Sequence, residues 1–308
     1  MRESASLRVA APPLIERPAA QALRLLWRDK FALVAACYLL LMALCALFGP
    51  ALLEDAATKM NLRGRNAPPF TLENGWLYLL GADALGRSIL ARLVVAAQNT
   101  LAVAAAAVAV AMTIGGILGL IAGYAGGFIG NLIMRLADVI MSFPSLLLAV
   151  VVLYVFEPRV ANLVLVLAVT RIPIYLRTTR AEVLELRERM FVSAARVMGA
   201  GPVRIVWRHV VPLVVPTLIT IATIDFAFVM LAESALSFLG IGIQPPEITW
   251  GLMVAQGRNY LAIAWWLAFW PGLAIMLTTL ALNLLSSWMR IATDPVQRWR
   301  LEVTEART

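Results

Sequence analysis

The chain has 308 residues, of which 61% are hydrophobic and 14% are charged, and its mean hydropathy is +0.83. Soluble domains have roughly half their residues apolar and about a quarter charged, so the composition excludes an ordinary soluble protein and favours a membrane protein. The net charge of +8 does not imply a nucleic-acid partner, because arginine-rich loops on the inner side of a membrane account for much of it.

Six apolar runs predict six membrane-spanning helices and an all-α fold, since about 20 helical residues cross the ~30 Å hydrocarbon layer. The runs cover residues 31–53, 93–122, 138–156, 160–176, 211–232 and 262–289. The first run is longer than the apolar part of a signal peptide, and we expect it to remain as the first span. The run at 160–176 is the shortest of the six.

Basic residues are distributed unevenly between the predicted loops. They crowd the segment before the first span and the loop between the fourth and fifth spans, whereas the loop after the third span holds only Arg159 and the 233–261 connection only Arg258. Basic residues are retained on the cytoplasmic side, so we expect both termini and the loop at 177–212 to be inside. The chain then divides into a cytoplasmic segment (1–30), a first span with its outer loop (31–92), a transmembrane core (93–290) and a cytoplasmic tail (291–308).

The outer loop contains GADALGRS, residues 81–88, which is close to a phosphate-binding loop. That pattern is Gly-x-x-x-x-Gly-Lys-Ser/Thr, with backbone N–H groups around the phosphates and the Lys reaching the terminal ones. Gly81, Gly86 and Ser88 fit, but Arg87 stands in place of the Lys. The loop is expected outside, where ATP is scarce, and no apolar strand precedes it. We therefore expect no nucleotide site here.

The inner loop predicts an extension of the fourth span, with Glu185 and Arg189 four residues apart, followed by a short second helix. Ser193 is the expected N-cap of this helix, Gly199 the left-handed residue that ends it, and Pro202 the residue that prevents its continuation. Small residues on an exposed helix suit insertion into a groove on another protein, where Arg196 can meet an acid. The alternative is a charged loop that only fixes the topology.

Two groups of residues inside the predicted spans are candidates for a role. Gly115, Gly119, Gly123 and Gly127 recur every four residues, which predicts a smooth helix face for close packing or, alternatively, for sliding along the solute pathway.

Asp225 lies deep within the fifth predicted span, where an acid normally faces a bundle interior or a water cavity. It either lines the pathway, meeting the amino terminus of a peptide, or bonds to a neighbouring helix. Glu233 is expected at the outer membrane interface, with contact to an external protein as the alternative.

The remaining polar residues do not predict catalysis or metal binding. Arg135 and Asp138 are three apart and are expected to pair on one helix face. His209 is the only histidine, so no histidine cluster exists for a metal. Aromatic residues of the last outer connection, such as Trp250 and Trp266, favour the headgroup level of a membrane, and the same connection could instead face a docked protein.

The segment SAARVMGAGPVRIVWRHVVP, residues 193–212, resembles the signature loop of the membrane subunits of binding-protein-dependent ABC importers. The family pattern is Glu-Ala-Ala, three residues, Gly, nine residues, then an ending like Ile-x-Leu-Pro. Ser193 replaces the Glu, and the remaining positions that fit are Ala194, Ala195, Gly199, His209, Val211 and Pro212. The resemblance extends over about residues 75–295, through LGADALGRSILARL, IMRLADVIMSFPSLLLA, AESALSFLGIGIQPPEITWG and AWWLAFWPGLAIMLT.

The resemblance is closest to the second, C-type permease of the dipeptide, oligopeptide and nickel group, in which Gly-Asp-Gly usually stands in place of Ser286, Ser287 and Trp288. It implies a type I permease fold in the bacterial cytoplasmic (inner) membrane, with no cofactor in this chain and no catalysis by it. The implied partners are a sibling permease, two cytoplasmic ATPases that bind ATP and Mg²⁺, an external solute-binding protein and membrane lipid. The residues implied in coupling to the ATPases are Ser193, Ala194, Ala195, Arg196, Gly199, Arg208, His209 and Pro212.

The resemblance leaves the solute open. Dipeptides or oligopeptides are the first expectation, and nickel chelates, glutathione or other small peptide-like solutes are the alternative within the same architecture. An alternative of another class is a stand-alone secondary transporter. A single clear membrane acid, Asp225, and the lack of an obvious inverted repeat argue against it.

Overall fold

The structure is a computed structural model that describes residues 25–71, 75–156 and 159–293. Their regular structure is helical, apart from one isolated bridge between Ala82 and Ser88, as the sequence predicts. Five stretches of helix are long and apolar enough to cross a membrane, and a bent pair of helices makes a sixth if it counts as one span. The segments expected to be cytoplasmic at 1–30 and 291–308 lie mostly outside the described residues.

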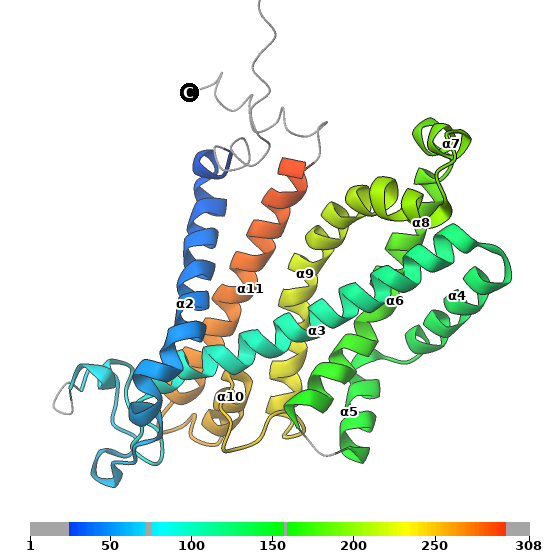
Figure 1. Cartoon of the computed structure of the whole chain (residues 1–308). Helices are drawn as coiled ribbons and strands as arrows, with labels where there is room; N and C mark the ends of the chain where they lie inside the picture. The colour runs from blue at the N-terminus through cyan, green and yellow to red at the C-terminus, as the bar shows by residue number, and fades with distance from the viewer. Residues whose placement is uncertain (1–24, 72–74, 157–158, 294–308) are drawn as a thin grey trace, which may run out of the picture.

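The spanning elements form one bundle (Figure 1). They are α2 (Lys30–Thr58), α3 (Ile89–Ala125), the bent pair α4 (Gly127–Met141) and α5 (Ser145–Val155), α6 (Val160–Leu186), α8 (Pro202–Ile205) continuing through a π turn into α9 (Val211–Phe238), and α11 (Trp266–Thr293). The long α3 packs on α2, α6 and α9, and α11 packs on α2 and α9. The start of α2, the end of α11 and the short α7 (Met190–Val197) lie at one end of the bundle, and the outer loop and α10 (Trp250–Arg258) lie at the other.

A close helix contact joins α3 to α6. A Cβ atom added to Gly115 would lie 2.6 Å from the Cβ of Tyr175, one on Gly119 would lie 2.5 Å from the Cβ of Thr179, and one on Gly123 would lie 2.7 Å from that of Val183. Real Cβ atoms do not approach so closely, so three successive turns of α3 need glycine here. This is the close packing that small residues permit between membrane helices.

Gly127 does not belong to this face, contrary to the prediction. α3 ends at Ala125, and Gly126 and Gly127 have φ values of +62° and +51° in the turn that starts α4. A Cβ on Gly127 would meet nothing within 4 Å. The four-residue spacing continues to Gly127 in the sequence, but α3 ends two residues before it. Gly127 therefore lies in the turn and not on the packing face of α3.

The third predicted span, 138–156, is wrong as a continuous helix. α4 ends at Met141, α5 begins at Ser145, and the two axes differ by 84°. Pro144 has no N–H to donate and disfavours helical backbone at the residue before it. The apolar run continues through Phe143 and Pro144, so hydropathy alone does not reveal the break.

The connection 233–261 contains a helix that the sequence analysis treated as part of a loop. α10 is buried against α9, α11 and α3. Trp250 is fully buried, and its indole N–H donates to the carbonyl oxygen of Leu93 at 2.8 Å. Trp266 is also buried, and its indole N–H donates to the carbonyl oxygen of Ala82 at 3.3 Å. These two side chains pack inside the protein and not at the headgroup level, because each finds an internal acceptor for its N–H.

The α3–α6 contact predicts a difference between two glycines of α3 that are three residues apart. In Gly119→Ala the new methyl group must displace Thr179 or the backbone of Leu176, whereas in Gly116→Ala its nearest neighbour is a Leu218 methyl group at 3.4 Å. Both substitutions gain the same helix propensity, so the difference reports the clash, which we expect to cost about 1–3 kcal/mol. Thermal unfolding of the purified proteins measures it, and equal melting temperatures would contradict the close approach.

Candidate functional site

The inner loop contains α7, whose start differs from the prediction. α7 begins at Met190 with Arg189 at the N-cap position, so Ser193 lies inside the helix and is not its cap. The turn that follows α6 brings the Arg189 carbonyl oxygen into range of the N–H groups of Val192 and Ser193, at 3.0 and 3.3 Å. The predicted ion pair between Glu185 and Arg189 is present and lies in the turn where α6 gives way to α7.

The end of α7 follows the prediction. Gly199 has a φ of +81°, and the N–H of Ala200 donates to the carbonyl oxygen of Ala195 at 3.0 Å. A left-handed glycine with this six-residue hydrogen bond is the Schellman ending of a helix. Pro202 then begins α8, so α7 is held at a fixed turn between two spans.

The two alanines of α7 face in opposite directions. Val192 and Ala195 are buried against the chain itself, whereas Ala194 is exposed with Ser193 and Arg196. Of these two small residues, Ala194 is accessible to a partner and Ala195 is not. Arg208 and Pro212 are exposed as well, and His209 is half-buried with its ring 6.5 Å from that of Phe191.

Part of the exposed surface of α7 and its C-cap is apolar, a feature that was not predicted from the sequence. Met190, Val197 and Met198 are 82–89% exposed, and we call these three residues the α7 apolar patch. Exposed arginines flank it, at positions 189, 196, 204 and 208. In the sequence, the signal for this patch is the presence of three large apolar residues within an arginine-rich loop. An exposed apolar patch with a charged rim is typical of a protein contact.

The outer turn GADALGRS folds around the carboxylate of Asp83, not around a phosphate. The backbone N–H groups of Leu85 and Arg87 each donate to Asp83 Oδ1 at 2.9 Å, and Arg87 Nε donates to Asp83 Oδ2 at 2.7 Å. The groups that a phosphate-binding loop would offer to a nucleotide are thus already bonded within the turn.

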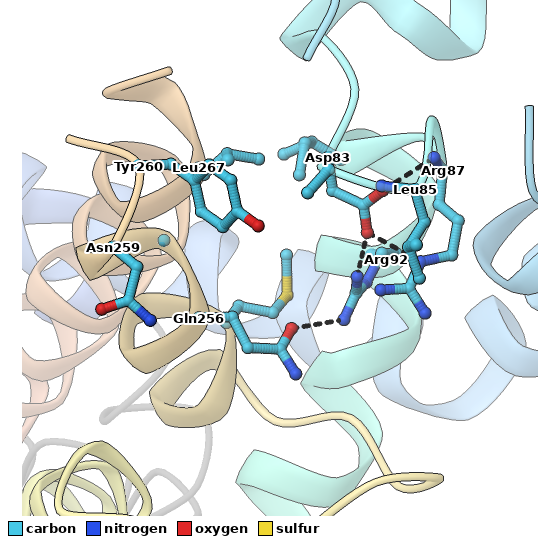
Figure 2. Close-up of a pocket in the computed structure, with 12 residues that line it drawn as sticks. Asp83, Leu85, Arg87, Arg92, Gln256, Asn259, Tyr260 and Leu267 are labelled. Carbon is cyan, nitrogen blue, oxygen red and sulfur yellow. Dashed lines mark hydrogen bonds and ion pairs between the residues drawn. The ribbon is translucent and has the colours of Figure 1, made fainter. Parts of the chain in front are cut away.

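The same carboxylate ties the turn to the bundle. Arg92, buried in the first turns of α3, donates to Asp83 Oδ2 and, through Nη2, to Gln256 Oε1 of α10 at 3.1 Å. Figure 2 shows this network on the wall of a pocket of about 350 Å³ that lies between the outer turn and α10. Asn259 and Tyr260 line the opposite side. Two arginines and one aspartate leave this wall with a net positive charge.

Asp225 does not stand alone in the membrane. It is buried, and both of its carboxylate oxygens accept hydrogen bonds from Arg171 of α6, one of them from Nε at 3.2 Å. Arg171 lies within the apolar stretch VLVLAVTRIPIYL, inside the span predicted at 160–176, where its role was not predicted. An acid at membrane depth requires a partner. The presence of Asp225 in a span therefore predicts a basic residue on a neighbouring helix.

Glu233 is fully buried inside the protein, so the prediction that it lies at the membrane interface is wrong. Its carboxylate accepts hydrogen bonds from the hydroxyls of Ser237 at 2.7 Å and Ser234 at 3.4 Å. α10 covers this region, since a Cβ on Gly251 would lie 2.5 Å from the Cα of Ser234. The buried position follows from α10, which the hydropathy pattern did not reveal.

Asp138 and Ser286 each make a contact between two helices. Asp138 pairs with Arg177 of α6 at 2.5 Å and not with Arg135, the partner predicted on its own helix. Ser286 is buried with its hydroxyl 3.5 Å from the carbonyl oxygen of Thr220. A small residue at this position therefore serves the packing of α11 on α9. No group of three metal-ligating side chains occurs among the described residues.

Comparison with known proteins gives matches over most of the chain. Residues 115–298 match the family described as binding-protein-dependent transport system inner membrane component, and residues 17–69 match the N-terminal transmembrane domain of oligopeptide transport permease C. The structure also resembles the methionine ABC transporter MetNI in an inward-facing conformation. The TM-score is 0.50 at 19% identity, over 66% of this chain and 96% of that one.

Curated relatives are similar over nearly their whole length. The chain is 41% identical over 269 residues to the dipeptide transport system permease protein DppC of Escherichia coli K12, covering 87% of this chain and 90% of that protein. It is 38% identical over 268 residues to the di/tripeptide permease DppC of Pseudomonas aeruginosa, covering 87% and 88%. It is 37% identical over 269 residues to the glutathione transport system permease protein GsiD of Escherichia coli O6:K15:H31, covering 87% of each.

The outer network predicts that Asp83 is needed for stability. In Asp83→Asn the buried Arg92 loses its charged partner, and breaking a buried ion pair costs about 3 kcal/mol or more. We expect a lower melting temperature and faster proteolysis of the outer loop. Asp55→Asn, at an exposed acid of the same outer region, is the matched control and should change stability by less than about 0.5 kcal/mol. Equal melting of the two variants would contradict the role of the network.

Proposed function

Because the chain belongs to the family of binding-protein-dependent transport system inner membrane components, we propose that it is a permease subunit of an ATP-driven importer of dipeptides and short oligopeptides. It lies in the bacterial cytoplasmic membrane with both termini inside. It forms the solute pathway with a sibling permease and receives solute from an external binding protein. ATP and Mg²⁺ bind to two partner ATPases and not to this chain.

The α7 apolar patch supports the coupling part of this proposal. α7 lies at the end of the bundle, between α6 and α8 (Figure 1), and its buried face, Val192 and Ala195, fixes it to the chain. The exposed patch is then free to enter a groove on an ATPase, with the flanking arginines against acids of that partner. A movement of the ATPase would reach α6 and α9 through this fixed helix.

Similarity to the peptide permeases supports the choice of solute. Relatives that are named for dipeptide or di/tripeptide transport align with 87% of the chain at 38–41% identity. Glutathione is the second candidate, because a relative at 37% identity is named for it. Glutathione is itself a small peptide-like solute, so the two candidates differ in the bound ligand and not in the architecture. Membership of a binding-protein-dependent family sets aside the stand-alone secondary transporter.

Uptake by cells tests the solute. We expect deletion of the gene to abolish uptake of a labelled dipeptide, and uptake in the parent strain to be reduced by excess unlabelled oligopeptide but not by a nickel chelate. Competition by glutathione alone would favour the second candidate. Unchanged dipeptide uptake after deletion, with expression confirmed in the parent strain, would refute peptide import as the function.

The α7 apolar patch predicts where the ATPases bind. In Met198→Asp a charge enters the proposed contact, and burying an unpaired charge is costly, so we expect the ATPases to co-purify about tenfold less or worse. Met60→Asp is the matched control, because Met60 is also exposed but lies in the loop at the opposite end of the bundle. Equal recovery of ATPases with both variants would place the contact elsewhere.

A further inference from the structure

The break between α4 and α5 is the most unusual feature of the bundle at membrane depth. It lies beside α6 (Figure 1) and forms one wall of a crevice that also contains Arg171. Arg171 is eleven residues from the outer end of α6, or about 16 Å along the helix, which is near the middle of a ~30 Å hydrocarbon layer. Non-helical backbone at this depth is tolerated only where protein covers it or where it lines a water-filled cavity.

Arg171 is held rigidly from two sides. Asp225 binds its guanidinium through Nε and Nη2, and the ring of Phe228 lies 4.2 Å from the guanidinium carbon. A guanidinium has five N–H donors, and the hydrogen bonds described here use two of them. The Arg171 side chain is 14% exposed and that of Asp225 is 4% exposed, so the base lies nearer to the surface of the crevice and the acid lies behind it.

The crevice has a volume of about 210 Å³ and is lined by both polar and apolar groups. Arg171, Thr170 and Ser145 provide its polar lining, and the remaining walls are apolar, among them Phe143 and Pro173. Ser145 is the first residue of α5, and Pro144 before it provides no side-chain cap. The N–H groups of the first helical turn are therefore directed toward the break, where the helix dipole adds positive potential.

We propose that this crevice binds the terminal carboxylate of a peptide in transit, with Arg171 as the binding group and Asp225 as the residue that positions it. A partly exposed guanidinium at membrane depth faces water or protein and not lipid, and the start of a discontinuous helix is a recurring place for anionic groups of transported solutes. The volume suits a carboxylate and the residue next to it, so the sibling permease would hold the rest of the peptide. This inference rests on the proposed function for the identity of the ligand.

The structure reverses the role expected for Asp225. As a pathway acid it would meet the amino terminus of a peptide, but its oxygens are already bonded to Arg171 and are almost inaccessible. Arg171 still offers N–H donors to the crevice, and these donors select a carboxylate.

Transport by the complete complex in proteoliposomes tests the proposal. The variant is Arg171→Gln with Asp225→Asn, which removes the charge without leaving an unpaired acid, and the measured quantity is the ratio of uptake rates for a dipeptide and its C-terminal amide. We expect the ratio to fall about tenfold from the wild-type value, because one charge-assisted hydrogen bond to the carboxylate is lost. A purely structural role would lower both rates and keep the ratio, and this result would overturn the proposal.

The same pair of substitutions at another ion pair is the control. Arg177→Gln with Asp138→Asn acts on the half-exposed pair between α6 and α4, outside the crevice, and should keep the wild-type ratio. A wild-type complex that imports no dipeptide would refute the proposed function, and the crevice would then be judged by the labelling below.

Thiol labelling tests the crevice without transport. In the assembled complex with Cys37→Ala, Cys45→Ala and Ser145→Cys, we expect an anionic methanethiosulfonate reagent to react faster than a cationic one, after normalisation to free cysteine. Adding Arg171→Gln and Asp225→Asn should remove this preference. No reaction, as for a lipid-facing or sibling-covered site, or a preference for the cationic reagent, would overturn the proposal.

Discussion

The contact between α3 and α6 is the constraint on which the other features of the chain depend. Three glycines of α3 bring the two backbones together over successive turns, where any side chain would collide with Tyr175, Thr179 or Val183. Packing attraction between membrane helices depends on such close approach, because lipid provides no hydrophobic force between them. α6 continues beyond this contact to the turn that carries α7, and it carries Arg171 in its middle. α3 carries Arg92 at its outer end, where it meets the outer turn and α10.

The buried acids divide this framework into three levels. At the outer level, Asp83 joins the outer turn to α3 and, through Arg92, to α10. Below it, Glu233 accepts hydrogen bonds from serines of α9 in the region that α10 covers. At mid-depth, Asp225 joins α9 to α6. A buried charge is costly unless it is paired or hydrogen-bonded, so each acid specifies which elements must meet at its level. The acids thus serve to fix geometry, and at mid-depth the exposed part of Arg171 remains available to a ligand at the crevice.

The sequence predicts the elements of this structure better than their contacts. Apolar runs predict the long spans, and the pattern around Gly199 predicts the end of α7, because both signals are local. The break at Pro144 is hidden, since the run stays apolar on both sides of it. α10 and the burial of Trp250 and Glu233 depend on tertiary packing, which hydropathy does not encode. Likewise Asp225 is visible as an acid in a span, but its partner is 54 residues away, and only the fold identifies it.

The same framework relates the α7 apolar patch to the crevice. α7 follows the inner end of α6 after a short turn and packs on α8 beyond Gly199, and α6 is held against α3 by the glycine contact. A force applied to the α7 apolar patch would therefore move α6 and α3 as one body, and Arg171 would move with them. α4 and α5 are separated by the break at Ser142–Pro144, so they need not follow that movement as a single rod. Packed helices shift between discrete arrangements and do not deform continuously. The proposed carboxylate site lies where the α3–α6 pair meets the break between α4 and α5. Closure of partner ATPases at α7 would therefore alter the shape of this crevice.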